Sequence, residues 1–307
     1  MRPARPLAAA LAEGVVVLDG GLSNQLEAQG CDLSDELWSA RLLADDPREI
    51  ETAHAAYVRA GAQVLITSSY QATFEGFERR GVVREEAAGL LARSVELART
   101  AGELVPHEVW VAASVGPYGA MLADGSEYRG RYGLSVRELE RFHRPRIEAL
   151  VAAGPDVLAL ETVPDMDEAE ALLRAVDAYG LPVWLSYTIT GERTRAGQEL
   201  AAAFALAAGR DQVIAVGVNC CDPRDADRAV ELAASVTAKP VVVYPNSGER
   251  WNTEERGWRG ASTYDPGRVR DWLASGARLV GGCCRVGPGQ IAELARAVTE
   301  VTEGGGR

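Results

Sequence analysis

Four of the five cysteines in this 307-residue sequence stand in two adjacent pairs, in the segments GVNCC and GGCC. Consecutive strand residues point to opposite faces, so the thiols of a pair such as Cys283–Cys284 converge only where the strand ends or bulges. Gly281 and Gly282 permit that change of direction. Three thiolates drawn from the two segments could bind Zn²⁺ through bonds of about 2.3 Å and leave the fourth tetrahedral position open. An open position is typical of a catalytic site rather than a structural one.

Other interpretations of these cysteines remain open. An adjacent pair also suits a redox-active dithiol or two small core residues, and neither pair has CxxC spacing. A non-catalytic zinc site would use the same thiols. Zinc is favoured among the common metals because thiolates are soft ligands. We expect the fifth cysteine, Cys31, to be incidental, and the three histidines, His54, His107 and His143, to be structural or surface residues.

Eight short apolar runs, rich in β-branched residues, recur along the chain, and each ends in a polar or glycine-containing turn. Such runs are typical of parallel strands that are covered on both faces. Stretches with helical spacing separate most of them, for example 84–103, 136–153 and 167–179. The pattern predicts an α/β protein, a closed (β/α)8 TIM barrel that forms a single domain over residues 1–307. The predicted strands are Val15–Asp19, Val64–Thr67, Val109–Ser114, Val157–Glu161, Val183–Tyr187, Val213–Asn219, Val241–Tyr244 and Leu279–Gly282.

Barrel enzymes carry their chemistry at the carboxyl ends of the strands. The two cysteine pairs fall at the ends of the sixth and eighth predicted strands, which one strand separates, a distance of roughly 10 Å that loops can close. Two long loops, Pro117–Gly133 and Asn246–Thr263, also follow strands, and loops of this length are commonly binding loops.

The overall composition limits the partners. The formal net charge of −12 argues against a nucleic acid or an anionic membrane surface, because phosphate binding needs clustered Lys and Arg. No apolar run is long enough for a transmembrane helix. The opening MRPARPLAAALAEG only faintly imitates a secretory signal, so we expect a cytoplasmic protein, in which thiols stay reduced.

Several motifs together resemble the homocysteine S-methyltransferases. They are GVNCC followed by GGCC, LDGGL near the start, ITSSYQATFEGF on the second predicted strand and LALETVPDMDEA on the fourth. The resemblance runs from about Val15 to Val298, with the motifs in the family's order. It implies a zinc-dependent barrel that methylates homocysteine sulfur, with Cys220, Cys283 and Cys284 as zinc ligands and as the catalytic residues. The sequence leaves open whether Cys221 replaces Cys220.

The substrates of such an enzyme suggest further contacts. The ammonium of homocysteine requires carboxylates, and Asp19 and Glu161 are the acidic residues at the ends of the first and fourth strands. The Gly20–Gly21 turn could bring backbone N–H donors to the substrate carboxylate. Ser114 and Asn219, at two other strand ends, complete the expected substrate-binding residues together with Tyr118.

The methyl donor is less well defined by the sequence. A sulfonium cation favours an electron-rich aromatic or acidic wall, for which the candidates by position are Trp38, Tyr70, Tyr118 and Tyr244. The motifs resemble the branch of the family that uses S-methylmethionine or S-adenosylmethionine, and S-methylmethionine is the first choice. A betaine- or selenocysteine-specific methyltransferase of the same family and a vicinal-dithiol redox barrel are the alternatives. We expect small-molecule substrates alone, homocysteine and a methyl-sulfonium donor, with neither nucleic acid nor membrane as a partner.

Overall fold

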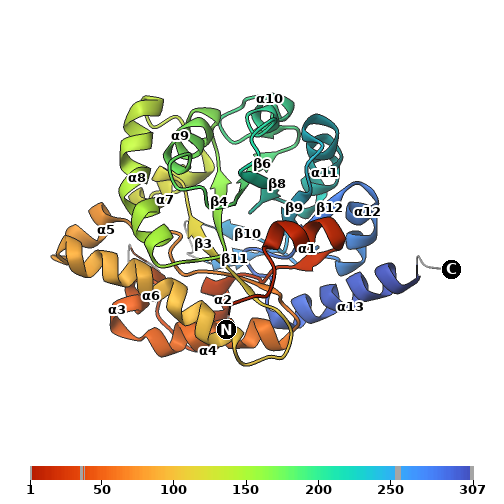
Figure 1. Ribbon diagram of the computed structural model, residues 1–307, viewed down its shortest axis with the longest axis horizontal. Coiled ribbons are helices and arrows are strands. Elements are labelled where there is room, and N and C mark those ends of the chain that lie inside the picture. The colour runs from red at the N-terminus through yellow and green to blue at the C-terminus, as the bar shows by residue number, and fades with distance from the viewer. Residues whose placement is uncertain (1, 35–36, 38, 253–256, 305–307) are drawn as a thin grey trace.

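The structure, a computed structural model, describes residues 2–34, 37, 39–252 and 257–304 (Figure 1). Its centre is a sheet of eight parallel strands in the order β1-β12-β9-β8-β5-β4-β3-β2. All eight predicted runs form these strands, which confirms the predicted barrel. Trp38 lies outside the described residues. The strands are β1 (Val16–Val17), β2 (Val64–Ile66), β3 (Trp110–Val115), β4 (Val157–Val163), β5 (Val183–Tyr187), β8 (Val213–Asn219), β9 (Val241–Tyr244) and β12 (Ala277–Val280).

Strands β1 and β2 close the sheet into a barrel, although they do not form a regular ladder. An isolated parallel bridge joins Leu18 to Val64. The Gln63 N–H donates to Val17 O at 2.8 Å, and the Asp19 N–H donates to Val64 O at 3.1 Å. The Gln63 side chain accepts the Val17 N–H at 3.1 Å. Backbone and side-chain hydrogen bonds together therefore hold this seam.

Helices cover the outside of the barrel between successive strands (Figure 1). The three helical stretches expected from the sequence are α6, α8 and α9, within a few residues at each end. Helix α8 begins at a capping box, in which Ser135 and Glu138 satisfy each other's backbone N–H groups. The helices are α2 (Leu22–Ala28), α3 (Ser39–Asp45), α4 (Pro47–Arg59), α5 (Phe74–Glu78), α6 (Arg84–Gly102), α8 (Val136–Ala152), α9 (Met166–Val176), α10 (Leu200–Ala205), α11 (Pro223–Thr237), α12 (Val269–Ala274) after the short turn η2 (Pro266–Arg268), and α13 (Pro288–Gly304).

Alternate residues of each strand enter two separate cores. On β3, for example, Val111 packs in the outer core between strands and helices, whereas Trp110 and Ala112 pack in the inner core within the barrel. Both faces of the strands are thus buried, which is why each strand is a continuous apolar run in the sequence.

The short helix α1 (Leu7–Glu13) packs against the inner core at the amino ends of the strands. Leu7 and Leu11 are fully or almost fully buried there, and the Trp110 indole N–H donates to Arg5 O at 3.0 Å. The Ala/Leu run that faintly imitates a signal peptide is therefore a structural helix that covers one end of the barrel.

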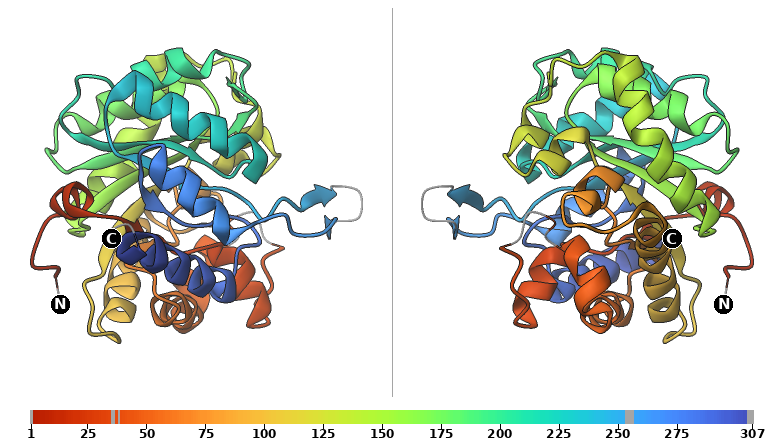
Figure 2. Two further views of the ribbon diagram at one scale, coloured as in Figure 1. Left: turned by 90° about the vertical axis from the view of Figure 1, so that its right-hand side faces the viewer. Right: turned by 90° about the vertical axis from the view of Figure 1, so that its left-hand side faces the viewer.

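The long loops lie at the opposite end and contain secondary structure of their own. The loop after β3 holds helix α7 (Tyr118–Leu122) and the 3₁₀ turn η1 (Ser126–Tyr128). Short hairpins follow β5 and β9, namely β6 (Ile189–Thr190) with β7 (Arg193–Thr194), and β10 (Arg250–Asn252) with β11 (Gly257–Arg259). Strands β10 and β11 extend away from the body of the barrel (Figure 2). Within the described ranges, no helix is both long and apolar enough to cross a membrane.

Candidate active site at the barrel mouth

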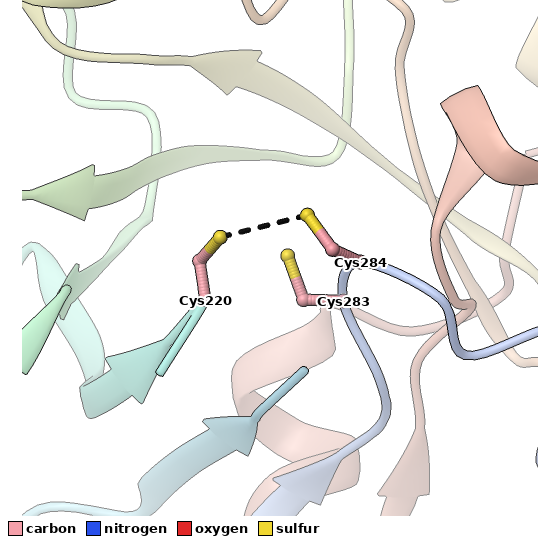
Figure 3. A group of neighbouring side chains, drawn as sticks. All are labelled: Cys220, Cys283 and Cys284. Atoms are coloured by element: carbon pink, nitrogen blue, oxygen red, sulfur yellow. Dashed lines mark hydrogen bonds between the residues drawn. The ribbon is translucent and has the colours of Figure 1, made fainter. Parts of the chain in front are cut away.

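Three of the predicted cysteines meet at the carboxyl ends of the strands. The Sγ atoms of Cys220, Cys283 and Cys284 all lie within 4.8 Å of one another, and those of Cys220 and Cys284 are 3.7 Å apart. Figure 3 shows the three thiols pointing toward one another from the end of β8 and from the loop after β12. One thiol of the first pair and both thiols of the second therefore form one cluster, as predicted.

The backbone at the end of β8 separates the two cysteines of the first pair. Cys220 has a φ of 49°, a left-handed conformation that is uncommon for a residue other than glycine. Its thiol reaches the mouth, whereas Cys221 is fully buried in the outer core. Burial raises the pKa of Cys221 well above its usual value, so this thiol stays protonated. Cys220 is thus the cysteine of this pair that belongs to the cluster.

Close packing fixes the loop that carries the second pair. A Cβ on Gly282 would lie 2.2 Å from the Val286 side chain, and one on Gly281 would lie 2.5 Å from Leu18 Cβ. The Cys284 N–H donates to Asn246 Oδ1 at 3.1 Å, and the Cys283 N–H donates to Pro245 O at 2.8 Å. The residues after β9 therefore hold both thiols in position.

The Gly20–Gly21 turn packs against the same loop. A Cβ on Gly20 would lie 2.2 Å from Val286 O, and one on Gly21 would lie 2.7 Å from Cys283 O. The Gly21 N–H donates to Val286 O at 2.9 Å, so it already has a partner within the protein. The two glycines therefore allow the turn to pack closely against the loop that carries Cys283 and Cys284. Their contact with substrate stays a prediction.

The electrostatics of the cluster favour a thiolate at Cys220. Hydrogen bonds from the Cys283 and Cys284 thiols hold the pKa of Cys220 well below its usual value, and these two donors have raised pKa values. The Tyr128 hydroxyl, 3.2 Å from Cys220 Sγ, adds a further hydrogen bond. Tyr128 is 38% exposed as a whole, but desolvation of its hydroxyl and the neighbouring Cys220 raise its pKa, so the hydroxyl remains a donor.

Sequence reasoning missed Tyr128 and selected Tyr118 from the same loop. The Tyr118 ring packs against Tyr132 and Phe142, with centroid distances of 5.2 and 4.8 Å. Only the length and position of the loop pointed to binding, and nothing in its sequence distinguishes its tyrosines. A contact between Tyr118 and substrate stays a prediction.

The Glu161 carboxylate lies buried at the mouth in a network of hydroxyl donors. Ser114 Oγ donates to Glu161 Oε1, and the Tyr244 hydroxyl donates to Oε2 at 3.0 Å. Burial raises the pKa of Glu161 to about 7, and the two hydrogen bonds oppose that rise. Trp184 Nε1 and Ser186 Oγ in turn contact the Tyr244 hydroxyl at 3.1 and 2.8 Å. Tyr244, a candidate for the donor wall, thus orients Glu161 from inside the barrel.

Asp19 is the second predicted carboxylate at the mouth. Its Oδ2 accepts the Ile66 N–H at 2.9 Å, while its Oδ1 is buried with no hydrogen-bond partner among the described residues. Burial and the nearby Glu161 raise its pKa well above the usual range. A buried carboxylate oxygen without a partner is suited to a cationic ligand.

Asn219 lies at the end of β8 with its amide engaged inside the protein. Its Oδ1 accepts the Thr162 N–H at 2.7 Å and the Ser186 hydroxyl at 2.9 Å, and its Nδ2 donates to Thr162 Oγ1 at 2.7 Å. Thr162, the penultimate residue of β4, has a φ of 57°. Asn219 therefore stabilises an unusual backbone turn beside Glu161, and its predicted contact with substrate is not tested by the structure.

The fold and the site together define a (β/α)8-barrel enzyme with a cluster of thiols and buried carboxylates at its mouth. The sequence profile of the homocysteine S-methyltransferases matches residues 16–298, and the chain belongs to this family. It is 45% identical to a homocysteine S-methyltransferase of Escherichia coli, covering 92% of this chain and 94% of that protein. It is accordingly a methyltransferase that transfers a methyl group to homocysteine.

Two further comparisons bear on the site. A selenocysteine Se-methyltransferase of Brassica oleracea is 40% identical, covering 91% of this chain and 87% of that protein. The metallated form of the Escherichia coli homocysteine methyltransferase MmuM superimposes with a TM-score of 0.86 at 44% identity, covering 95% of this chain and 99% of that chain.

Proposed function

We propose that this protein is a zinc-dependent enzyme that moves a methyl group from a sulfonium donor to the thiol of L-homocysteine and so forms methionine. S-Methylmethionine is the first choice of donor, and S-adenosylmethionine is the second. The observation that carries the proposal is the convergence of three thiols beside two buried carboxylates, since homocysteine presents a thiol and an ammonium.

The three thiols fit a zinc ion. With bonds of about 2.3 Å, two thiolates of a tetrahedral zinc site lie about 3.8 Å apart. The separation of 3.7 Å between Cys220 Sγ and Cys284 Sγ agrees with this value, and Cys283 Sγ lies within 4.8 Å of both. Soft thiolate donors favour zinc over the harder divalent ions. A zinc ion held by Cys220, Cys283 and Cys284 would supply a fourth position at which a substrate thiol loses its proton.

The remaining residues bind and orient the substrates. We assign the homocysteine ammonium to Glu161, which Ser114 and Tyr244 hold, and to Asp19 Oδ1, which has no hydrogen-bond partner among the described residues. A bond then forms between the homocysteine sulfur and the methyl carbon while the bond from that carbon to the donor sulfur breaks. The donor leaves as a neutral thioether, so alignment matters more than proton transfer. We place the enzyme in the cytoplasm, where the thiols stay reduced.

The test combines metal content with donor choice. Freshly purified, reduced protein is expected to contain about one zinc per chain. It is also expected to methylate homocysteine with S-methylmethionine faster than with S-adenosylmethionine or betaine. Full activity in protein that lacks metal would overturn the zinc assignment. A preference for betaine would overturn the donor assignment, and faster turnover of selenocysteine than of homocysteine would overturn the acceptor assignment.

A further inference from the structure

Glu127 is a third buried carboxylate near the mouth, and the roles described above do not include it. The residue is 9% exposed, and its Oε2 has no hydrogen-bond partner among the described residues. No ion pair involves Glu127 in the part of the chain that the structure describes. A buried carboxylate without a cation is costly in an empty site, and this cost is removed when a cationic ligand binds.

The turn that carries Glu127 is held rigidly. Asp124 Oδ1 accepts the Ser126 N–H at 2.9 Å, and Ser126 O accepts the Gly130 N–H at 2.9 Å. Helix α7 packs directly against the turn, because a Cβ on Gly119 would lie 2.4 Å from Glu127 N. The carboxylate is therefore presented by ordered backbone.

The position of Glu127 places it beside the cysteine cluster. The next residue, Tyr128, brings its hydroxyl to 3.2 Å from Cys220 Sγ. Burial, with the nearby Cys220 as a smaller cause, raises the pKa of Glu127 to about 7. Glu127 in turn contributes to the raised pKa of Tyr70, which Cys220 and Glu161 also influence. The influence of Cys220 on both Glu127 and Tyr70 indicates that these two residues lie near the thiol that Tyr128 contacts.

The proposed reaction brings two cationic groups into this space. Asp19 and Glu161 lie close enough for Glu161 to raise the pKa of Asp19, and together they suit the ammonium of homocysteine. We propose that the Glu127 carboxylate, with the ring of Tyr70, binds the sulfonium centre of the methyl donor. This inference rests on the proposed function, because it requires a sulfonium donor.

The donor loses its positive charge during the reaction, so the Glu127 contact should have a distinct effect on the kinetics. The donor is positively charged before transfer and a neutral thioether after it, so a carboxylate at the sulfonium favours the donor over the spent product. A contact of this kind is present when substrate binds and weakens as the charge leaves the sulfur. Its loss therefore raises the KM for the donor more than it lowers kcat.

The experiment compares Glu127→Gln with Asp124→Asn in the zinc-loaded enzyme. We expect Glu127→Gln to raise the KM for S-methylmethionine by about 30-fold or more, the effect of removing one partner of a buried charge pair. The KM for homocysteine and the zinc content should stay within twofold of the wild type. Asp124→Asn is the matched control, since Asp124 is exposed on the same loop and Asn retains the cap on Ser126. Its donor KM should not change.

A binding measurement separates this inference from the proposed function. By calorimetry, wild-type enzyme should bind S-methylmethionine more tightly than methionine. Glu127→Gln should abolish this preference, and Glu127→Asp should retain part of it. Wild-type enzyme that turns over S-methylmethionine while Glu127→Gln keeps the wild-type donor KM and preference overturns the role of Glu127 alone. Wild-type enzyme that uses no sulfonium donor overturns the proposed function, and the role of Glu127 with it.

Discussion

Cys220 and Cys221 illustrate how one backbone angle assigns different roles to identical neighbours. The left-handed φ of 49° at Cys220 takes its thiol to the cluster, and Cys221 continues into the outer core. Alternation along a strand predicts that only one of the two thiols faces Cys283 and Cys284. The structure confirms this prediction and identifies Cys220 as that residue.

Substitution of each cysteine by alanine should separate these roles. Cys220→Ala is expected to lose most zinc and to abolish methyl transfer, because it removes one of three thiols within 4.8 Å of one another. Cys221→Ala should keep zinc and most of the rate and lose about 1 kcal/mol of unfolding free energy through poorer packing. Zinc stoichiometry, homocysteine methylation and urea unfolding measure the three quantities. Zinc loss in Cys221→Ala alone would contradict the assignment.

The pKa of Glu161 predicts how homocysteine binding depends on pH. Burial raises this pKa to about 7, so the carboxylate becomes protonated, and loses its attraction for the ammonium, as the pH falls through about 7. The Tyr244 hydroxyl stabilises the charged form. In a plot of the homocysteine KM against pH, Tyr244→Phe should therefore shift the midpoint to a higher pH. The wild-type profile is the reference, and an unchanged or lowered midpoint would show that Tyr244 does not stabilise the charged carboxylate.

At the scale of elements, a buried polar cluster on α8 and α9 anchors the loop that carries Glu127 and Tyr128. Glu168 Oε1 accepts the Tyr118 N–H at 2.5 Å and the His143 Nε2–H at 2.9 Å. Arg146 Nη2 contacts His143 Nδ1 at 2.7 Å and donates to Gly116 O. Burial and Arg146 hold the pKa of His143 far below its usual value, so the imidazole is neutral. The contacts with the Tyr118 N–H and with Gly116 O both lie where the loop leaves β3.

Removal of the Glu168 charge should loosen this anchor. Glu168→Gln removes the carboxylate that contributes most to keeping the buried Arg146 charged, which is expected to cost about 3 kcal/mol of unfolding free energy. Methyl transfer should fall while zinc content stays unchanged, because the cysteines lie on other elements.

Glu170→Gln is the matched control on the same helix. Glu170 is partly exposed and pairs with Arg174, so its loss should cost less than about 1 kcal/mol. Chemical unfolding and donor KM are the measurements. Equal effects of the two substitutions would show that α9 responds to any loss of charge.

At the scale of the whole molecule, the two ends of the barrel have separate tasks. Helix α1 covers the amino ends of the strands, while all three cluster cysteines lie at the other end. Leu11→Ala should remove about 2–5 kcal/mol of unfolding free energy, the usual cost of truncating a buried leucine. The kcat of the folded fraction should stay unchanged. A large fall in kcat at full folding would show that the two ends are coupled.

The parts predicted from sequence are those that local pattern specifies. Each buried parallel strand is a continuous apolar run, so all eight strands and the cysteine cluster at their ends could be predicted. Glu127 and Tyr128 could not, because their positions depend on contacts such as Gly119 against the η1 turn and Glu168 with the Tyr118 N–H. The hydrogen bond from Tyr244 to Glu161 could not be predicted either, for a similar reason. The Tyr244 ring lies inside the barrel, where only the assembled strands bring it to Glu161.

The Asp19 side chain links the site to the most weakly paired junction of the barrel. Its Oδ2 accepts the Ile66 N–H across the seam between β1 and β2, where an isolated bridge stands in place of a regular ladder. A ligand on Asp19 Oδ1 would hold the carboxylate in place and oppose local opening of this seam. Homocysteine should therefore slow amide hydrogen exchange at Ile66 and leave exchange unchanged on β5, which carries neither carboxylate. Substrate binding at the mouth would then be detectable as less frequent local opening of the barrel wall.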